Sequence, residues 1–196
     1  MKKEFVLASA SPRRLAILQQ IGIFPKVVVS EAAEVKDGLP EKVVKHNALA
    51  KGQAVSNTFA GENKIIIASD TIVVADHHIL GKPQSEADAF AMLTTLSGRS
   101  HWVYSGLALI DTLTGDFLVD FDKTEVFFHE TSQQDLVKYL KTGEPMDKAG
   151  AYGIQEKGAL LVKKIVGDYY TVMGLPLPLL KKMLSLWHID LWDYVK

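Results

Sequence analysis

Residues 65–75 carry the sequence IIIASDTIVVA, and this stretch decides the fold. A β-branched apolar run of this kind is typical of a buried strand that has both faces covered. Asp70 interrupts the run without a turn, although a carboxylate is costly to bury unless it is paired or bound to a metal. We therefore take Asp70 as a candidate catalytic or metal-binding residue. The alternative is an ordinary aspartate in a turn at the end of a strand.

The apolar spacing on either side of this strand alternates between strand and helix periods, which predicts an α/β fold. We expect further strands at residues 4–8, 26–30, 101–110 and 117–128, and helices at residues 12–21, 41–59, 85–97, 132–141 and 177–187. Thr114-Gly115 predicts a hairpin between the two long strands, and Gly167-Asp168 predicts another between residues 159–165 and 169–173. No linker rich in Pro, Gly or Ser divides the chain, so we expect a single domain over residues 1–196.

The composition excludes several classes of protein. The chain has 196 residues, of which 47% are hydrophobic and 23% charged, as in an ordinary globular domain. It has no cysteine, which excludes a disulfide scaffold, a Cys-ligated zinc site and a Cys nucleophile. The six histidines lack the spacing of a zinc-binding helix, and His77-His78 is expected at a hairpin tip. No segment has the length of a membrane span or the pattern of a signal peptide, so we expect a cytoplasmic protein without a membrane partner.

The charge balance bears on the partner. Twenty-two basic and 23 acidic residues give a formal net charge of −1. Proteins that bind nucleic acid usually carry a basic excess or a basic stripe, so we expect no nucleic-acid partner. A small phosphorylated ligand held by a few local cations is compatible with this charge.

Residues 9–14, with the sequence SASPRR, predict an anion site. Ser11-Pro12 is a typical helix start, and its free amide groups favour negative charge. Arg13 and Arg14 lie in the first turn, where cations are unfavourable unless a ligand compensates them. Two guanidinium groups, small hydroxyl side chains and free amides together suit a phosphate. The alternative is that both arginines point into solvent.

Two further segments are candidates for ligand binding. Gly81-Lys82-Pro83 alone indicates a turn, because the chain has neither a Walker loop nor a G-x-G-x-x-G motif. Residues 147–155, with the sequence DKAGAYGIQ, contain small residues that allow backbone to approach a ligand. Gln155 offers both a donor and an acceptor to a base edge. The alternative is a glycine-rich surface loop.

Taken together, these segments resemble the Maf family of nucleoside triphosphate pyrophosphatases, once described as septum formation inhibitors. The resemblance rests on residues 7–14, 68–73, 81–83, 96–101, 147–155 and 167–176, in the family's order. It implies a single elongated domain with a central mixed sheet flanked by helices, similar to inosine triphosphate pyrophosphatases. It also implies a homodimer that splits dTTP and UTP between the α- and β-phosphates, with Mg²⁺ or Mn²⁺.

The resemblance assigns roles to individual residues. Asp70 matches the family's proton acceptor, and Arg13, Thr71 and Gln155 match positions tied to the choice of dTTP and UTP. The branch that prefers 7-methyl-GTP has Gln in place of Thr71. The expected phosphate-binding residues are Ser9, Ser11, Arg14, Lys82 and Lys51, and the expected metal ligands are Glu34 and Asp70. Whether Asp70 acts as a general base, or holds the metal or orients the water, stays open.

One position departs from the family. Many relatives have a phosphate-binding lysine that aligns with Gln53, whereas this chain has Lys51, two residues earlier. Two residues on a helix point to roughly opposite sides. Either Lys51 reaches around the helix, or the site works with one cation fewer.

Two other functions remain open from the sequence. The protein could be a pyrophosphatase for other or modified nucleotides, or a non-catalytic regulator of cell division that only senses nucleotides. Asp70, Lys82 and Arg13 favour catalysis, because a pure binder has no need of a water-activating acid. The apolar tail at residues 187–194 either docks on its own core or packs across a dimer.

Overall fold

The run of isoleucines and valines forms the strand β3 (Lys64–Ala75), which lies at the centre of the fold. A computed structural model describes residues 2–195. Along one edge, β3 pairs with β5 (Ser100–Asp111) over ten successive residues. Along the other edge, it pairs in parallel with β1 (Glu4–Ala8) at its start and antiparallel with β4 (His78–Leu80) at its end. Ile66, Ile67 and Ala68 are fully buried, as expected for a strand covered on both faces.

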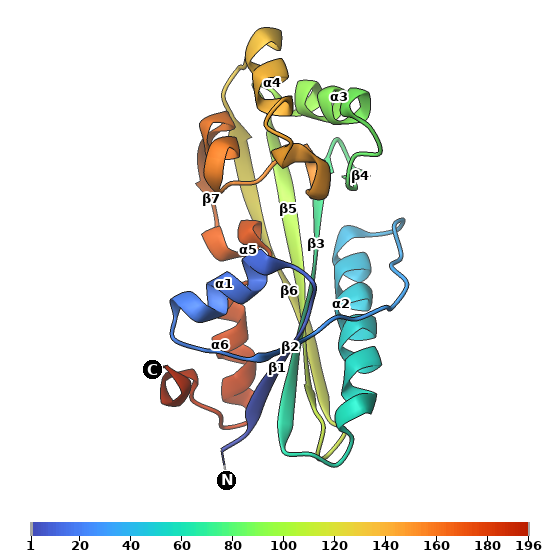
Figure 1. Cartoon of the computed structure of the whole chain (residues 1–196), viewed down its shortest axis with the longest axis vertical. Coiled ribbons are helices and arrows are strands. Elements are labelled where there is room, and N and C mark those ends of the chain that lie inside the picture. The colour runs from blue at the N-terminus through green and yellow to red at the C-terminus, as the bar shows by residue number, and fades with distance from the viewer. Residues whose placement is uncertain (1, 196) are drawn as a thin grey trace.

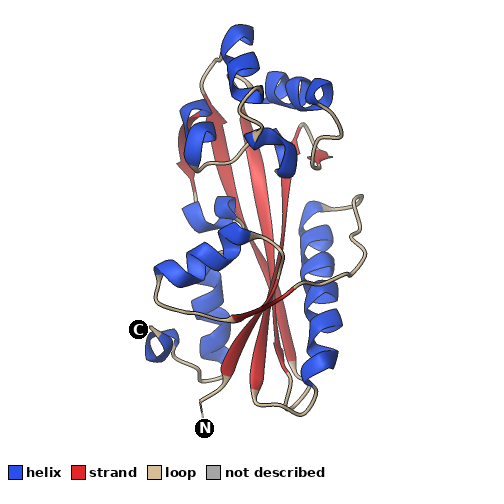
Figure 2. Ribbon diagram, in the orientation of Figure 1, coloured by secondary structure: helices blue, strands red, loops and turns tan. Residues whose placement is uncertain are grey.

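The described residues form a seven-stranded mixed sheet in the order β2-β1-β3-β5-β6-β7, with β4 attached to β3 (Figures 1 and 2). The remaining strands are β2 (Lys26–Val28), β6 (Phe117–Phe128) and β7 (Val162–Val166); the helices are α1 (Pro12–Gln20), α2 (Pro40–Ser56), α3 (Glu86–Leu96), α4 (Gln133–Leu140), α5 (Tyr169–Met173) and α6 (Leu177–Leu186), with short 3₁₀ turns η1 (Asn57–Phe59), η2 (Glu144–Asp147), η3 (Ala149–Ala151), η4 (Glu156–Leu161) and η5 (Leu191–Tyr194). The molecule is elongated along β3, β5 and β6. The expected α/β class and the hairpin at Thr114-Gly115 are confirmed.

Successive side chains of β3 point to opposite faces of the sheet, and each face has its own cover. Ile65 and Ile67 pack against α1 and α6, whereas Ile66 and Ala68 pack against α2. Toward the far end of the strand, Val73 packs with α3 and α4. Asp70 therefore points toward α2, and its neighbour Thr71 points toward α1 and α5.

The edge of β3 is open between its two short partners. Pairing with β1 ends at Ile67, and pairing with β4 begins at Val73. The intervening residues of β3, which include Asp70 and Thr71, are paired only with β5. This gap lies at the carboxyl end of β1, where parallel strands of open α/β sheets commonly offer a ligand site.

The predicted second hairpin is wrong. Residues 169–173 form the helix α5 instead of a strand, and residues 159–161 belong to η4. The Asp168 side chain accepts a hydrogen bond from the Thr171 amide at 2.9 Å, which is a helix N-cap contact. Gly174 ends α5 in the left-handed conformation. The β-branched and aromatic residues of this segment suggested a strand, but capping at both ends favours one helical turn.

The apolar tail docks on the core of its own chain. Leu191 is 8% exposed within the cluster that includes β1 and α6. The Tyr194 ring stacks on Phe5 with centroids 4.3 Å apart. Of the two placements considered for residues 187–194, the structure shows the first. Among residues 2–195 there is no helix with the length and apolar character needed to span a membrane.

We expect Leu191→Ala to lower the free energy of unfolding by about 2–3 kcal/mol, because it removes a buried side chain and leaves a cavity at a chain end. Trp192→Ala is the matched control, since Trp192 is 68% exposed and its removal should cost less than about 1 kcal/mol. Urea unfolding of both variants measures the difference. Equal losses would mean that the tail does not dock through Leu191.

A buried histidine gives the fold a pH dependence. His101 Nε2 lies 2.7 Å from the Tyr152 hydroxyl, and burial lowers the pKa of His101 to about 4. Between pH 6.5 and 4 the unfolded chain therefore binds a proton that the folded chain excludes. Stability from this group is complete above pH 6.5 and falls as the pH drops, by at most about 1.4 kcal/mol per pH unit.

We expect urea unfolding between pH 7 and 4.5 to show this slope, and His101→Gln to remove it. The comparison uses the slopes of the two proteins, since the substitution also changes the absolute stability. Identical slopes would show that another group controls stability in this range.

Candidate active site

A cleft of about 660 Å³ opens at the gap in the edge of β3. Its walls come from the loop after β1, the loop before α2, the turn after β4 and the segment around residues 147–156. All ten residues that the sequence singled out line this cleft: Ser9, Ser11, Arg13, Arg14, Glu34, Lys51, Asp70, Thr71, Lys82 and Gln155. Segments up to 146 residues apart in sequence thus meet at one place.

The approach of α2 to the sheet determines the surroundings of Asp70. Gly106 lies directly opposite Asp70 in the β3–β5 ladder. A Cβ atom at Gly106 would lie 2.2 Å from the Val44 carbonyl oxygen, so only glycine permits this contact between helix and strand. Asn47, one turn further along α2, then donates from Nδ2 to Asp70 Oδ2 at 2.9 Å. The buried carboxylate is held by the helix that covers it.

Lys51 supplies the positive charge beside Asp70. Its Nζ atom lies 2.6 Å from Asp70 Oδ1 and also 2.6 Å from Glu34 Oε1. One ammonium group therefore joins the strand carboxylate to the loop before α2. Asn47 ties that loop down further, because its side chain exchanges two hydrogen bonds with the backbone of Val35.

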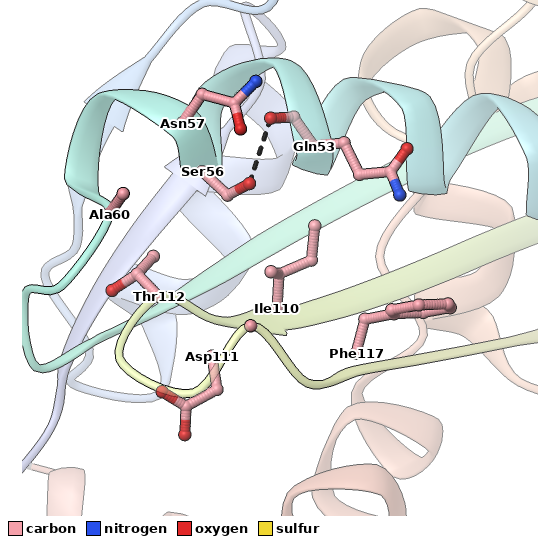
Figure 3. Close-up of a pocket in the computed structure, with 9 residues that line it drawn as sticks. Gln53, Ser56, Asn57, Ala60, Ile110, Asp111, Thr112 and Phe117 are labelled. Atoms are coloured by element: carbon pink, nitrogen blue, oxygen red, sulfur yellow. Dashed lines mark hydrogen bonds between the residues drawn. The ribbon is translucent and has the colours of Figure 1, made fainter.

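Lys51 of α2 lies in the cleft, so the site does not lack a cation. Gln53 points away from the cleft, into a separate groove of about 430 Å³ between α2 and the β5–β6 hairpin. Figure 3 shows its side chain near Phe117 and Ile110. Of the two alternatives for Lys51, the structure shows the first, since its side chain reaches the cleft from the inward face of α2, which also carries Asn47.

Arg14 joins the first helix to the sheet. Its guanidinium donates to Ser9 Oγ at 3.1 Å, to Thr71 Oγ1 at 3.2 Å and to the Gly174 carbonyl at 2.8 Å. Burial lowers the pKa of Arg14, and the charge of Asp70 acts against this shift. Thr71 Oγ1 also lies 2.8 Å from the hydroxyl of the buried Ser105. Thr71 is thus held in one orientation from two sides.

Arg13 makes a contact across the cleft. Its Nη1 atom lies 3.3 Å from Asp147 Oδ2, and Lys148 Nζ lies 2.8 Å from the other oxygen of the same carboxylate. Partial burial acts to raise the pKa of Asp147, but the hydrogen bond and charge of Lys148 and the charge of Arg13 outweigh it and lower the pKa. Asp147 therefore stays ionised and pairs with Arg13 across the cleft, at the wall formed by residues 147–156.

The remaining predicted residues present unpaired groups to the cleft. Ser11 is the N-cap residue of α1, but its side chain does not cap the helix. Lys82 is exposed on the turn after β4, and this turn is fixed by a hydrogen bond from the Gly150 amide to the Gly81 carbonyl at 3.0 Å. Within residues 2–195, the Gln155 amide side chain has no hydrogen-bond partner. These groups are available to a ligand.

Three residues that shape the site were not predicted from the sequence. Asn47 is a polar side chain on the inward face of α2 between Val44 and Ala48, and that position was the available signal. Ser105 lies in an apolar strand and was hidden by its neighbours. Glu144, buried next to the 147–155 segment, gave no local signal at all. Among residues 2–195, no three or more His, Cys, Asp or Glu side chains gather to hold a metal ion.

Comparison with known proteins shows which family of proteins this chain resembles. The family model described as Maf-like protein matches residues 4–187. A dTTP/UTP pyrophosphatase from Dictyoglomus thermophilum is 48% identical over 188 residues, which cover 94% of this chain and 96% of that protein. A protein of the same name from Clostridium beijerinckii is 46% identical, with 92% of this chain and 97% of that protein covered.

In fold, the chain is similar to a HAM1 protein from Coxiella burnetii. That structure aligns with a TM-score of 0.52 at 18% identity and covers 94% of this chain and 100% of its own. This similarity confirms the expected mixed α/β fold. With matches to the family model and to relatives over nearly its whole length, the chain belongs to the Maf-like protein family.

Proposed function

We propose that the protein hydrolyses dTTP and UTP to the nucleoside monophosphate and pyrophosphate. One observation carries this proposal: a buried carboxylate, Asp70, lies in a cleft together with Arg13, Arg14, Lys51 and Lys82. A polyanionic substrate needs the four cations, and a hydrolytic reaction needs an acid that directs water. The names of the relatives from Dictyoglomus and Clostridium support the nucleotide class.

The triphosphate is expected to bind between the start of α1 and the turn that carries Lys82. The amide groups at the N-terminus of α1 favour an anion, and no acidic side chain lies in the first turn of this helix. Arg14 is held in place by Ser9 and Gly174, so little side-chain entropy is lost when it contacts a phosphate oxygen. Arg13, which is partly exposed, and Lys82, which is exposed, complete the contacts.

The base is expected to lie against the opposite wall of the cleft. The free amide of Gln155 can donate and accept at the edge of a pyrimidine. Thr71, fixed by Arg14 and Ser105, offers a small hydroxyl group and leaves space that a larger side chain would fill. Arg13 reaches toward the same wall through Asp147.

A divalent cation, Mg²⁺ or Mn²⁺, fits the residues present. Glu34 Oε1 and Asp70 Oδ1 both lie 2.6 Å from the same ammonium group, so the two carboxylates can share one cation. Mg²⁺ sites in nucleotide enzymes commonly use one or two carboxylates and complete their shell with substrate phosphates and water. When bound by Glu34 and Asp70, such an ion would supply charge for the phosphoryl oxygens and lower the pKa of a bound water.

Asp70 is the group that directs the attacking water. Asn47 fixes Oδ2, so the carboxylate keeps one orientation, and Oδ1 faces the cleft beside Lys51. The water oxygen bonds to a phosphorus of the α,β-linkage as the bridging P–O bond breaks, and Asp70 accepts the proton that the water loses. Lys51 stabilises the negative charge that develops on the phosphate oxygens.

The quaternary structure and the location of the protein are also part of the proposal. The resemblance to the family supports a homodimer in the cytoplasm, with no nucleic acid or membrane as partner. A role in nucleotide-pool housekeeping, with a link to arrest of cell division, follows from the same resemblance.

We expect purified protein with Mg²⁺ or Mn²⁺ to release pyrophosphate from dTTP and UTP in preference to purine triphosphates and 7-methyl-GTP.

Asp70→Asn keeps the shape of the side chain and should lower kcat by roughly 10²–10⁴, the usual effect of losing a general base. Affinity for a non-hydrolysable dTTP analogue should stay within a few-fold, since one negative charge beside a polyanion is removed. Normal turnover by Asp70→Asn would contradict the assignment.

The two candidate lysine positions can be separated by a matched pair of variants. Lys51→Met should weaken binding of a non-hydrolysable dTTP analogue by roughly 10–100-fold, because the charge-assisted contact between the ammonium group and the phosphates is lost. Gln53→Met, on the outer side of the same helix, should leave affinity within about twofold. Isothermal calorimetry measures both values. A larger loss in Gln53→Met than in Lys51→Met would reverse the assignment.

A further inference from the structure

Glu144 is a buried carboxylate that no step above uses. It lies at the start of η2, is 7% exposed, and its carboxylate accepts three hydrogen bonds. Oε1 accepts from the Tyr139 hydroxyl and from the Gly158 amide, each at 3.0 Å. Oε2 accepts from the Lys157 amide at 3.1 Å. Because a buried charge without such partners is costly, this arrangement indicates a specific role for the carboxylate.

The two amide donors of Glu144 come from the far end of the segment that begins with Glu144 itself, and the Tyr139 hydroxyl comes from α4. The carboxylate thus joins residue 144 to residues 157 and 158 and closes a loop of the chain. Lys148 closes a smaller ring inside it, since its Nζ atom donates to the Glu144 carbonyl at 2.7 Å. A Cβ atom at Gly158 would lie 2.1 Å from the Gly153 carbonyl oxygen, so the loop is tightly packed across its width.

This loop holds strained backbone. Ala151 has φ 60° and Glu156 has φ 57°, both in the left-handed region that favours glycine. Such residues persist only where the surroundings over-determine them, and they gather at ligand sites. Glu156 directly follows Gln155, and it lies immediately before the two amides that Glu144 holds. The three hydrogen bonds to the Glu144 carboxylate, called the clamp below, therefore lie next to this strained backbone.

Gln155 and Arg13 are the two groups expected to contact the nucleotide base from this wall of the cleft, and both depend on the 144–158 loop. Gln155 lines the cleft with an unpaired amide side chain, and Asp147 holds Arg13 at 3.3 Å. Neither Gln155 nor Asp147 contacts the Glu144 carboxylate, so Glu144 can act on them only through the backbone. The three hydrogen bonds would determine where Gln155 and Arg13 stand before a nucleotide arrives.

We propose that Glu144 is a positioning residue for substrate selection: by clamping the 144–158 loop, it presents Gln155 and, through Asp147, Arg13 to the base of the nucleotide. This inference rests on the proposed hydrolysis of dTTP and UTP and extends it to a residue outside the cleft. Glu144 itself touches no substrate. Its loss should therefore change affinity and selectivity more than the chemical step.

The test uses one conservative variant, one graded variant and one structural control. Glu144→Gln places an NH₂ group against the Lys157 or Gly158 amide, so donor faces donor. Tyr139→Phe removes only the hydroxyl donor and keeps the ring. Leu96→Ala is the control, because Leu96 is buried in the same apolar cluster as Tyr139 and forms no hydrogen bond with Glu144.

In Glu144→Gln we expect KM for dTTP to rise roughly tenfold and kcat to stay within about threefold, as for a lost charge-assisted hydrogen bond in the binding wall. The ratio of kcat/KM for dTTP to that for dGTP should fall roughly tenfold, and in Tyr139→Phe about threefold. Leu96→Ala should lower the thermal midpoint and leave this ratio unchanged. Hydrogen exchange of the amides at residues 147–158 should accelerate in Glu144→Gln and not in Leu96→Ala.

An unchanged dTTP-to-dGTP ratio in folded Glu144→Gln would overturn the positioning role, and so would an equal fall in Leu96→Ala. Wild-type protein that releases no pyrophosphate would overturn the proposed function instead. In that case, the ratio of the affinities for non-hydrolysable dTTP and dGTP analogues replaces the kcat/KM ratio. A ratio that Glu144→Gln leaves unchanged would then overturn the role of Glu144.

Discussion

The ammonium group of Lys51 lies between two carboxylates, and the rest of the site depends on this contact. Asp70 interrupts a buried strand, so its charge needs a partner close at hand, and Lys51 reaches it at 2.6 Å. This is possible only because α2 lies directly on β5 at Gly106, the residue opposite Asp70. The same lysine draws in Glu34 and with it the loop before α2. One close packing contact thereby creates one wall of the cleft.

The cleft itself is a consequence of how the short strands end. β1 and β4 pair with the two ends of β3 and leave its middle free at one edge. Because side chains alternate along a strand, Asp70 and Thr71 face opposite sides of the sheet. At an edge without a neighbouring strand, both can border one cavity. The acid and the selectivity residue of the proposed reaction are therefore adjacent in sequence and still belong to different walls.

In the free protein, much of the positive charge in the cleft is already paired. Lys51 is bound to Asp70 and Glu34, and Arg13 shares Asp147 with Lys148. A triphosphate that binds as proposed would exchange the partners of Lys51, and the cost of that exchange would be the same for every nucleotide. In the proposed assignment, discrimination between bases rests on Gln155 and on Arg13 held by Asp147, and both depend on the 144–158 loop.

The α/β class of the fold and ten of the residues that line the cleft were predicted from the sequence. The β-branched run with Asp70 indicated a buried strand with a functional acid, and SPRR indicated an anion site at a helix start, because both signals are local. The helix α5 was missed, since its strand-like side chains are overruled by the Asp168 cap. Only the tertiary structure decided that Lys51 faces the cleft, that Asn47 holds Asp70, and that Glu144 ties the loop together. These contacts join residues from separate segments or opposite ends of one loop, and their direction depends on backbone packing that no local pattern encodes.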